Sequence, residues 1–134
     1  MTARAADLDW LLDELAQRLP GVRHAVLLST DGLLMARCST TEEADAEHFC
    51  AMASALHGLA RSAGGRFAGG EVRQAVIDLD HAVMFVTAAG PNACIGLWAE
   101  ESANMGMVAY EMNQTVQRVG AYMSASPRPD VRCP

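Results

Sequence analysis

An Asp-Gly pair between two apolar runs is the feature that most constrains the fold of this chain. Residues 22–29 and 33–38 are rich in valine, leucine and alanine, and Asp31-Gly32 lies between them. Because an Asp-Gly turn between two such runs favours a tight β-hairpin, this segment predicts two neighbouring antiparallel strands. The chain therefore contains a sheet, and the segments around the hairpin must pack against it.

Three helices and three further strands complete the predicted order. Leucines at helical spacing predict a helix over residues 7–19, which Pro20-Gly21 ends. A second helix is predicted over residues 40–63, starting at a capping box formed by Thr40 and Glu43 and ending at Gly64-Gly65. The remaining apolar runs predict strands over residues 72–79, 82–88 and 93–99, and a last helix over residues 104–123.

The element order α-β-β-α-β-β-β-α predicts an α+β fold with a five-stranded, mainly antiparallel sheet. Most strands are joined by turns that are too short for a crossover connection, which indicates antiparallel pairing. Because the strands are apolar on both faces, we expect helices on both faces of the sheet. The length fits one domain, predicted over residues 7–124, with disordered tails at residues 1–6 and 125–134.

Composition excludes several classes of partner. The net charge is −6 and the chain has no lysine, which argues against nucleic acid and against direct binding to anionic membranes. The sequence shows neither a signal peptide nor an apolar stretch long enough to span a bilayer, so we expect a cytoplasmic location. In that reducing compartment the four cysteines are expected to be free thiols, and their spacing fits no zinc site. They are Cys38, Cys50, Cys94 and Cys133.

No motif in the sequence carries catalytic chemistry. The glycine-rich segment 64–70 lacks the GK[ST] ending of a phosphate loop and precedes a strand instead of a helix. No serine lies in a nucleophile elbow, and the four histidines show no metal-binding spacing. Asp78 and Asp80 bracket a predicted hairpin turn, where aspartate is common for local reasons. We therefore predict a non-enzymatic protein with no catalytic residues, no metal and no cofactor.

The middle helix carries three stripes at helical spacing. The first is apolar and is predicted to pack on the sheet; it comprises Phe49, Met52, Leu56, Leu59 and Ala63. The second consists of small residues, namely Ala44, Ala51, Ala55, Gly58 and Ser62. A glycine inside a helix costs about 0.5–1 kcal/mol relative to alanine, so Gly58 needs compensation. Two interpretations stay open: alanine is simply abundant here, or the same helix of a second subunit packs on this stripe.

The third stripe of the middle helix is polar. It comprises Glu43, Glu47, Ser54 and Arg61. These residues are either ordinary solvated surface or a docking face for a partner, and the sequence does not decide between the two. If the small stripe pairs two subunits, the two copies of the polar stripe lie side by side and form one composite surface.

Several segments of the chain resemble the roadblock family, named for a dynein light chain and also called LC7. LDWLL at residues 8–12, GVRHAVLLS at 21–29 and DGL at 31–33 resemble the first helix, first strand and turn of that family. GEVRQ at residues 70–74 resembles the start of its central strand. MVAYEMN at residues 107–113 resembles the last helix of its actinobacterial members, whose operons, called conservons, also encode a sensor-kinase-like protein and a small GTPase.

The resemblance implies a roadblock/profilin-like fold and a homodimer formed through the second helix and third strand. The residues then expected at the dimer interface are Ala44, Ala51, Ala55, Gly58, Ser62, Val72, Gln74 and Val76. It also implies binding to a Ras-like small GTPase, whose GTP hydrolysis some bacterial relatives promote, and association with the sensor-kinase-like protein of the same operon. Recruitment to the membrane would then occur through these partners.

Two alternatives remain at the level of the sequence. A PAS- or profilin-like module that senses a small ligand shares the same small sheet flanked by helices, and would need a pocket between sheet and helix. The low aromatic content of 5% makes a cofactor cage less favourable. The other alternative is a dimeric scaffold that has no GTPase partner.

Overall fold

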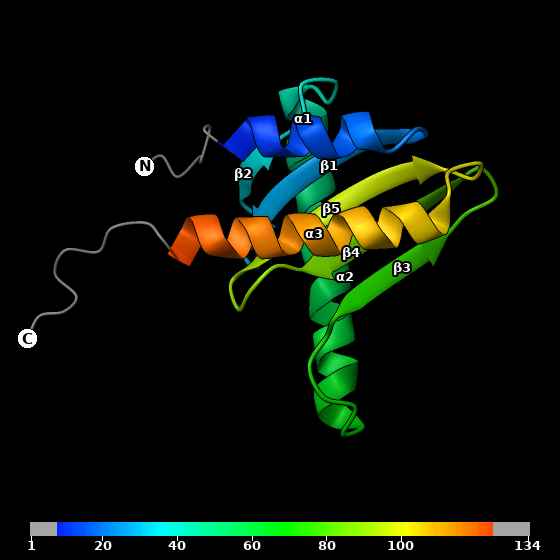
Figure 1. Ribbon diagram of the computed structural model, residues 1–134. Helices are drawn as coiled ribbons and strands as arrows, with labels where there is room; N and C mark the ends of the chain where they lie inside the picture. The colour runs from blue at the N-terminus through cyan, green and yellow to red at the C-terminus, as the bar shows by residue number, and fades with distance from the viewer. Residues whose placement is uncertain (1–7, 125–134) are drawn as a thin grey trace, which may run out of the picture.

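The computed structural model describes residues 8–124, which form three helices and one five-stranded sheet (Figure 1). The helices are α1 (Asp9–Arg18), α2 (Glu43–Arg66) and α3 (Met105–Ser124). The strands are β1 (Val22–Ser29), β2 (Leu34–Arg37), β3 (Gln74–Asp78), β4 (Ala82–Ala88) and β5 (Ala93–Glu100). The order α-β-β-α-β-β-β-α and the α+β class are therefore confirmed, and every pair of neighbouring strands is antiparallel.

The strands lie in the order β2-β1-β5-β4-β3, so that β2 and β3 form the two edges. The predicted hairpin joins β1 to β2, and Gly32 adopts a φ of +93°, a conformation that favours glycine. Because β2 and β3 lie at opposite edges, the segment between them has to cross the whole sheet. Helix α2 makes this crossing, and its C-terminal part extends beyond β3 (Figure 1).

Both faces of the sheet carry helices, as predicted. Helices α1 and α3 cover one face, where the leucines of α1 pack on β1 and β5 side chains such as Leu27 and Ile95 (Figure 1). Helix α2 covers the other face, where Phe49 and Ala53 pack on Val26. The sheet is thus the middle of three layers, with a separate hydrophobic cluster on each side.

The predicted boundaries of α2 need two corrections. The helix starts at Glu43 after Glu42, and the hydroxyl of Thr40 instead donates to the Arg23 carbonyl oxygen at 3.4 Å, so the expected capping box is not formed. The helix also continues through Gly64-Gly65 to Arg66. Gly64 is needed for close packing, since a Cβ there would collide with the carbonyl oxygen of Gly70.

The predicted apolar stripe of α2 is wrong in part. The α2 residues buried in the structure are Ala46, Phe49, Cys50, Ala53 and His57. Met52 and Leu59 are 49% and 68% exposed, and Ala63 is also exposed. Leu59 and Ala63 follow His57, the last buried residue of α2, so they lie past the part of the helix that packs on the sheet. In the packed part, Ala46, Cys50 and Ala53 contact the sheet together with Phe49, and Met52 lies on a neighbouring side.

The domain boundaries at residues 7 and 124 stay a prediction. The predicted tails, together with Cys133, lie outside the described residues. Cys38, Cys50 and Cys94 are buried as free thiols. None of the helices within residues 8–124 combines the length and apolarity that a bilayer crossing demands.

Candidate protein-interaction surface

Strand β3 forms an open edge of the sheet. It pairs with β4 on one side, and no strand of residues 8–124 lies on the other. Val76, at its centre, is 50% exposed, and Gln74 is exposed with its Nε2 donating to Thr87 Oγ1 at 3.2 Å. Val72 precedes the strand, which starts at Gln74, and is half-buried. Two of the three predicted β3 interface residues therefore lie on an edge that a further strand can join.

The small stripe of α2 lies on the side of the helix that faces away from the sheet. Ala44, Ala51, Ala55 and Ser62 are exposed, and Gly58 is half-buried. A Cβ placed on Gly58 would meet nothing within 4 Å, so nothing in the single chain requires a glycine at this position. The stripe is free to contact another molecule.

Large apolar side chains accompany the small stripe along α2 and beyond it. Met52 and Leu59 are exposed on α2, and Phe67, which follows the last helical residue, is 79% exposed. Leu59 and Phe67 follow His57, the last buried residue of α2. The C-terminal part of this helix extends past β3 (Figure 1). Exposed large apolar side chains that gather on one element mark interaction sites more often than plain surface does. Sequence reasoning missed this surface because it assigned Met52 and Leu59 to the sheet.

The four residues of the polar stripe have different surroundings. Ser54 is half-buried, and its Oγ donates to the Thr30 carbonyl oxygen at 2.9 Å in the β1–β2 turn. Glu43 is exposed with Oε1 3.9 Å from Arg37 Nη2, and Glu47 is exposed as well. Arg61 is exposed near the C-terminal end of α2. Ser54 thus has a role within the chain, and Glu43, Glu47 and Arg61 present charges to solvent.

A cleft of about 410 Å³ separates the C-terminal half of α2 from the segment before β3. Its lining includes His57, Arg61 and Val72. Burial lowers the pKa of His57, and the nearby Arg61 charge lowers it further. The imidazole is therefore neutral at physiological pH, and the fixed positive charge in this cleft belongs to Arg61.

The buried thiols beneath α2 are held in the protonated form. Burial, assisted by the Glu47 charge, raises the pKa of Cys50 to about 12. Burial also raises the pKa of Cys94, with Arg61 acting in the opposite direction. Because the thiolate is the reactive form, these cysteines are poor nucleophiles and poor metal ligands in the folded chain. Across residues 8–124 no group of three or more His, Cys, Asp or Glu side chains is arranged to hold a metal ion.

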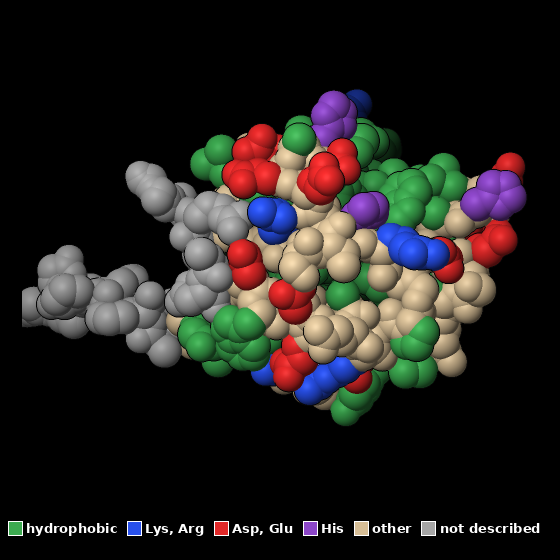
Figure 2. All heavy atoms as spheres, turned by 90° about the horizontal axis from the view of Figure 1, so that it is seen from above, with side chains coloured by type: hydrophobic (Ala, Val, Ile, Leu, Met, Phe, Trp, Pro, Cys, Tyr) green, Lys and Arg blue, Asp and Glu red, His purple; other side chains and the backbone are tan. Residues whose placement is uncertain are grey.

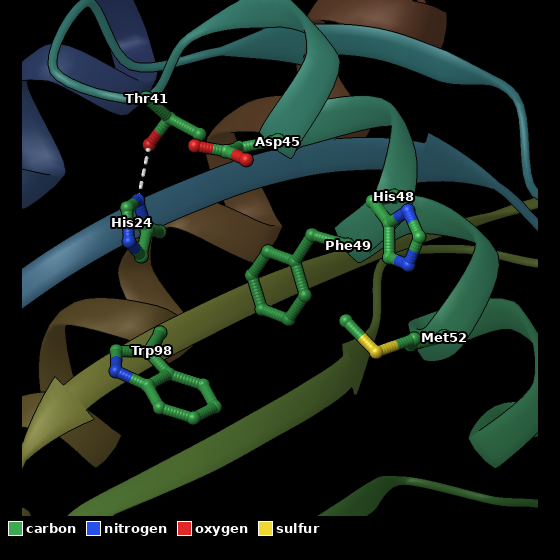
Figure 3. Close-up of a pocket in the computed structure, with 7 residues that line it drawn as sticks. All are labelled: His24, Thr41, Asp45, His48, Phe49, Met52 and Trp98. Atoms are coloured by element: carbon green, nitrogen blue, oxygen red, sulfur yellow. Dashed lines mark hydrogen bonds between the residues drawn. The ribbon is translucent and has the colours of Figure 1, made fainter.

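A second cleft, of about 230 Å³, opens between α2 and the other end of the sheet (Figure 3). Phe49, Met52 and Trp98 give it an apolar lining, and His24 Nδ1 lies 3.0 Å from Thr41 Oγ1 at its rim. The residues around it are His24, Thr41, Asp45, His48, Phe49, Met52 and Trp98. They come from β1, α2, β5 and the loop before α2, so no single stretch of sequence indicated this cleft.

The space-filling view from above places hydrophobic side chains in a broad patch toward the right, with histidines on both sides of it (Figure 2). Acidic side chains are scattered over the rest of this face (Figure 2). This view looks at the end of the molecule opposite to the projecting C-terminal part of α2, so it does not show the surface formed by β3 and that part of the helix (Figures 1 and 2).

Comparison with known proteins identifies a family for the chain. A family model described as Roadblock/LC7 domain matches residues 8–99. The crystal structure of a Roadblock/LC7 domain from Streptomyces avermitilis is 42% identical, with a TM-score of 0.85, over 88% of this chain and 98% of that one. No curated protein matches the chain at a significant level.

More distant structures share the fold. MglB from Myxococcus xanthus has a TM-score of 0.80 at 10% identity, over 89% of this chain and 96% of that one. Profilin II from Acanthamoeba castellanii has a TM-score of 0.54 at 14% identity, over 89% of this chain and 98% of that one. The predicted likeness to both roadblock and profilin folds is therefore confirmed at the level of architecture.

Proposed function

Because this chain belongs to the Roadblock/LC7 domain family, we propose that it acts as a homodimeric, non-enzymatic regulator or scaffold of a Ras-like small GTPase in bacterial signalling. The observation that carries the dimer is the open β3 edge beside an α2 helix whose small stripe and large apolar residues Met52 and Leu59 are exposed within residues 8–124. Family membership supports the GTPase partner.

In the proposed dimer, β3 pairs with its own copy across a twofold axis and the two sheets become one. This pairing covers an edge that would otherwise invite aggregation. The same axis makes the α2 surface self-complementary, which is the usual geometry of a homodimer. The interface comprises Ala44, Ala51, Ala55, Gly58, Ser62, Val72, Gln74 and Val76, as the sequence predicted, and we add Met52 and Leu59 because they are exposed.

The GTPase docks on the surface that the two α2 helices share. In the dimer the copies of Glu43, Glu47 and Arg61 border one composite face, and one GTPase per dimer follows from that arrangement. A regulator shifts the nucleotide state of its GTPase only by binding one conformation of the switch loops more tightly than the other. Recruitment to the membrane, and contact with a sensor-kinase-like protein, would occur through this complex.

The test is a binding and turnover assay with the Ras-like GTPase encoded nearest to this protein. The purified dimer is mixed with the GTPase loaded with GDP or with a GTP analogue, and GTP hydrolysis is measured with and without it. We expect binding that differs at least several-fold between the two nucleotide states. Glu47→Arg should weaken binding, whereas Glu101→Arg, an equal charge change at an exposed site in the β5–α3 turn, should not. Absence of binding in both states would reject the GTPase partner.

A ligand-sensing module is the second candidate, and the cleft between α2 and the sheet is the observation in its favour. Its volume of about 230 Å³ is below the ~300–1,000 Å³ usual for sites of small-molecule ligands. A small molecule released from the purified protein, and detected by mass spectrometry, would support this candidate. An intact dimer that binds no GTPase in either state would instead support the scaffold without a GTPase partner.

A further inference from the structure

Phe67 is an exposed aromatic residue whose backbone is held at the end of α2. Among the described residues it is the most exposed of the large hydrophobic side chains, at 79%. Its backbone N–H donates to the Ala63 carbonyl oxygen at 3.0 Å, which holds it against the last turn of α2. A single chain leaves this ring in water, so its burial requires another molecule.

The symmetry of the proposed homodimer places the end of one α2 near the start of the other. His57 is the last buried residue of α2, so the helix leaves the sheet just after it, at the β3 edge. A twofold axis that pairs β3 with its copy therefore passes close to Gly58. The two α2 helices then run antiparallel, and positions equally distant from Gly58 face each other. Phe67 and Phe49 lie nine positions after and before Gly58, so each Phe67 lies opposite the Phe49 region of the second copy.

The direction of the Phe67 side chain agrees with this placement. Phe67 follows Phe49 by 18 positions, which is five full turns of an α-helix at 3.6 residues per turn. Both rings therefore leave α2 on the same side, the side on which Phe49 meets its own sheet. Past the β3 edge, the sheet on that side belongs to the second copy.

The receiving surface has the size and chemistry that a phenyl ring requires. The cleft of about 230 Å³ beside Phe49 is lined by the apolar side chains of Phe49, Met52 and Trp98 together with four polar residues, His24, Thr41, Asp45 and His48. A cavity of roughly 150 Å³ already holds a benzene molecule, so one ring fits here without rearrangement. The aromatic rings of Phe49 and Trp98 offer edge and face contacts to the incoming ring.

From these observations we infer that Phe67 of each chain inserts into the cleft of the second copy, between Phe49, Met52 and Trp98. This inference rests on the proposed homodimer and gives it a specific anchor. Two rings are buried per dimer, one at each end of the paired helices. A buried aromatic anchor contributes more to the binding free energy than most other residues of an interface. The two anchor sites therefore fix the position of one α2 against the other.

Photo-crosslinking tests the contact directly. p-Benzoylphenylalanine is placed at position 67 of the full chain, the protein is irradiated, and linked peptides are identified by mass spectrometry. Positions 67 and 49 of one helix are about 27 Å apart, so a link from position 67 to residues 45–52 or to Trp98 arises only between chains. We expect this link, and we expect none from the same probe at Tyr110, an exposed aromatic position on α3.

The outcomes separate the inference from the proposed dimer. A protein that elutes as a dimer but gives no link between position 67 and the cleft overturns the inference and leaves the homodimer standing. A protein that is monomeric at micromolar concentration overturns both. A link to the cleft in a dimeric sample supports the inference.

A second measurement uses the fluorescence of Trp98. The chain has two tryptophans, so Trp10→Phe leaves Trp98 as the sole reporter. In this background Phe67→Ala is expected to weaken the dimer by about 10²-fold or more, because two buried rings are removed. At concentrations where both proteins remain dimeric, acrylamide should quench Trp98 several-fold more in Phe67→Ala. Tyr110→Ala is the matched control, and equal quenching in all three proteins would overturn the inference.

Discussion

The two edge strands of the sheet, β2 and β3, have different surroundings. At the β2 edge, side chains of α1 reach the backbone: Asp9 Oδ1 accepts from the Arg37 N–H at 3.0 Å, and Asp13 Oδ1 accepts from the Ser39 N–H at 2.6 Å. At the β3 edge the sheet stops at a strand whose central valine is half exposed, under a helix that extends past it (Figure 1).

This difference separates what stabilises one chain from what joins two. The β2 side is partly closed within the chain, because carboxylates of α1 accept from two backbone N–H groups at this edge and the α1 leucines are buried. The β3 side leaves strand donors and acceptors, small residues and large apolar side chains available. We therefore expect substitutions on the closed side to change folding stability, and those on the open side to change association.

The largest effect is expected from Leu12→Ala on the closed side. Leu12 is 1% exposed in the core beneath α1, and removing a buried leucine side chain costs about 2–5 kcal/mol of unfolding free energy. Leu33→Ala, the same change at an exposed position in the β1–β2 turn, should cost less than about 0.5 kcal/mol. Urea unfolding monitored by circular dichroism measures both, and equal losses would contradict the assignment of the core.

The next effect concerns the open side. Gly58→Arg should convert the dimer into a monomer that stays folded, because the added side chain has free space within one chain but would lie between the paired α2 helices. Gly120→Arg is its matched control on α3, where an added Cβ also meets nothing within 4 Å. Light scattering behind a sizing column distinguishes them. A dimeric Gly58→Arg protein would place the contact elsewhere.

Hydrogen exchange compares the two edges directly. In the dimer the outward amides of β3 are expected to exchange slowly, since they bond to the paired copy. In the Gly58→Arg protein these amides should exchange about tenfold or more faster, whereas β2 amides should not change. If β3 exchanges at the same rate in both proteins, its edge is not paired in the wild type.

The smallest expected effect is a pH dependence of stability through His57. Because burial lowers the pKa of this histidine from 6.5, the unfolded chain binds a proton at a higher pH than the folded chain does. Stability is therefore full above about pH 6.5 and decreases as the pH falls below it. Thermal unfolding at several pH values measures this decrease in stability. It should be shallower than in the wild type for His57→Phe, and the same as in the wild type for the exposed-site control His81→Phe. If the stability of His57→Phe decreases with falling pH as steeply as that of the wild type, His57 is not the cause of the pH dependence.

The order of the elements could be predicted because its signals are local. Asp31-Gly32 marked the β1–β2 hairpin, and Pro20-Gly21 marked the end of α1. The end of α2 could not be read in the same way. Gly64 resembles a helix terminator in the sequence, but in the fold it serves the close approach of the segment around Gly70, which no local pattern encodes.

The faces of α2 show where pattern reasoning stops. The sheet-facing side carries Ala46, Phe49, Cys50, Ala53 and His57, so only one of its five residues is a large hydrophobic side chain. Large apolar residues such as Leu59 then fall on the side that one chain leaves open. Hydrophobicity alone predicts that Leu59 is buried and His57 is exposed. The structure shows the opposite. The Trp98 cleft was equally unpredictable, because its residues come from distant parts of the chain.

The most direct test of the central claim is the mass of the wild-type protein in solution. Sedimentation equilibrium over a series of micromolar concentrations measures it without a tag or a surface. The open β3 side predicts twice the mass of one chain, with a reversible shift to single chains on dilution. The mass of one chain at every concentration in the series would contradict the account.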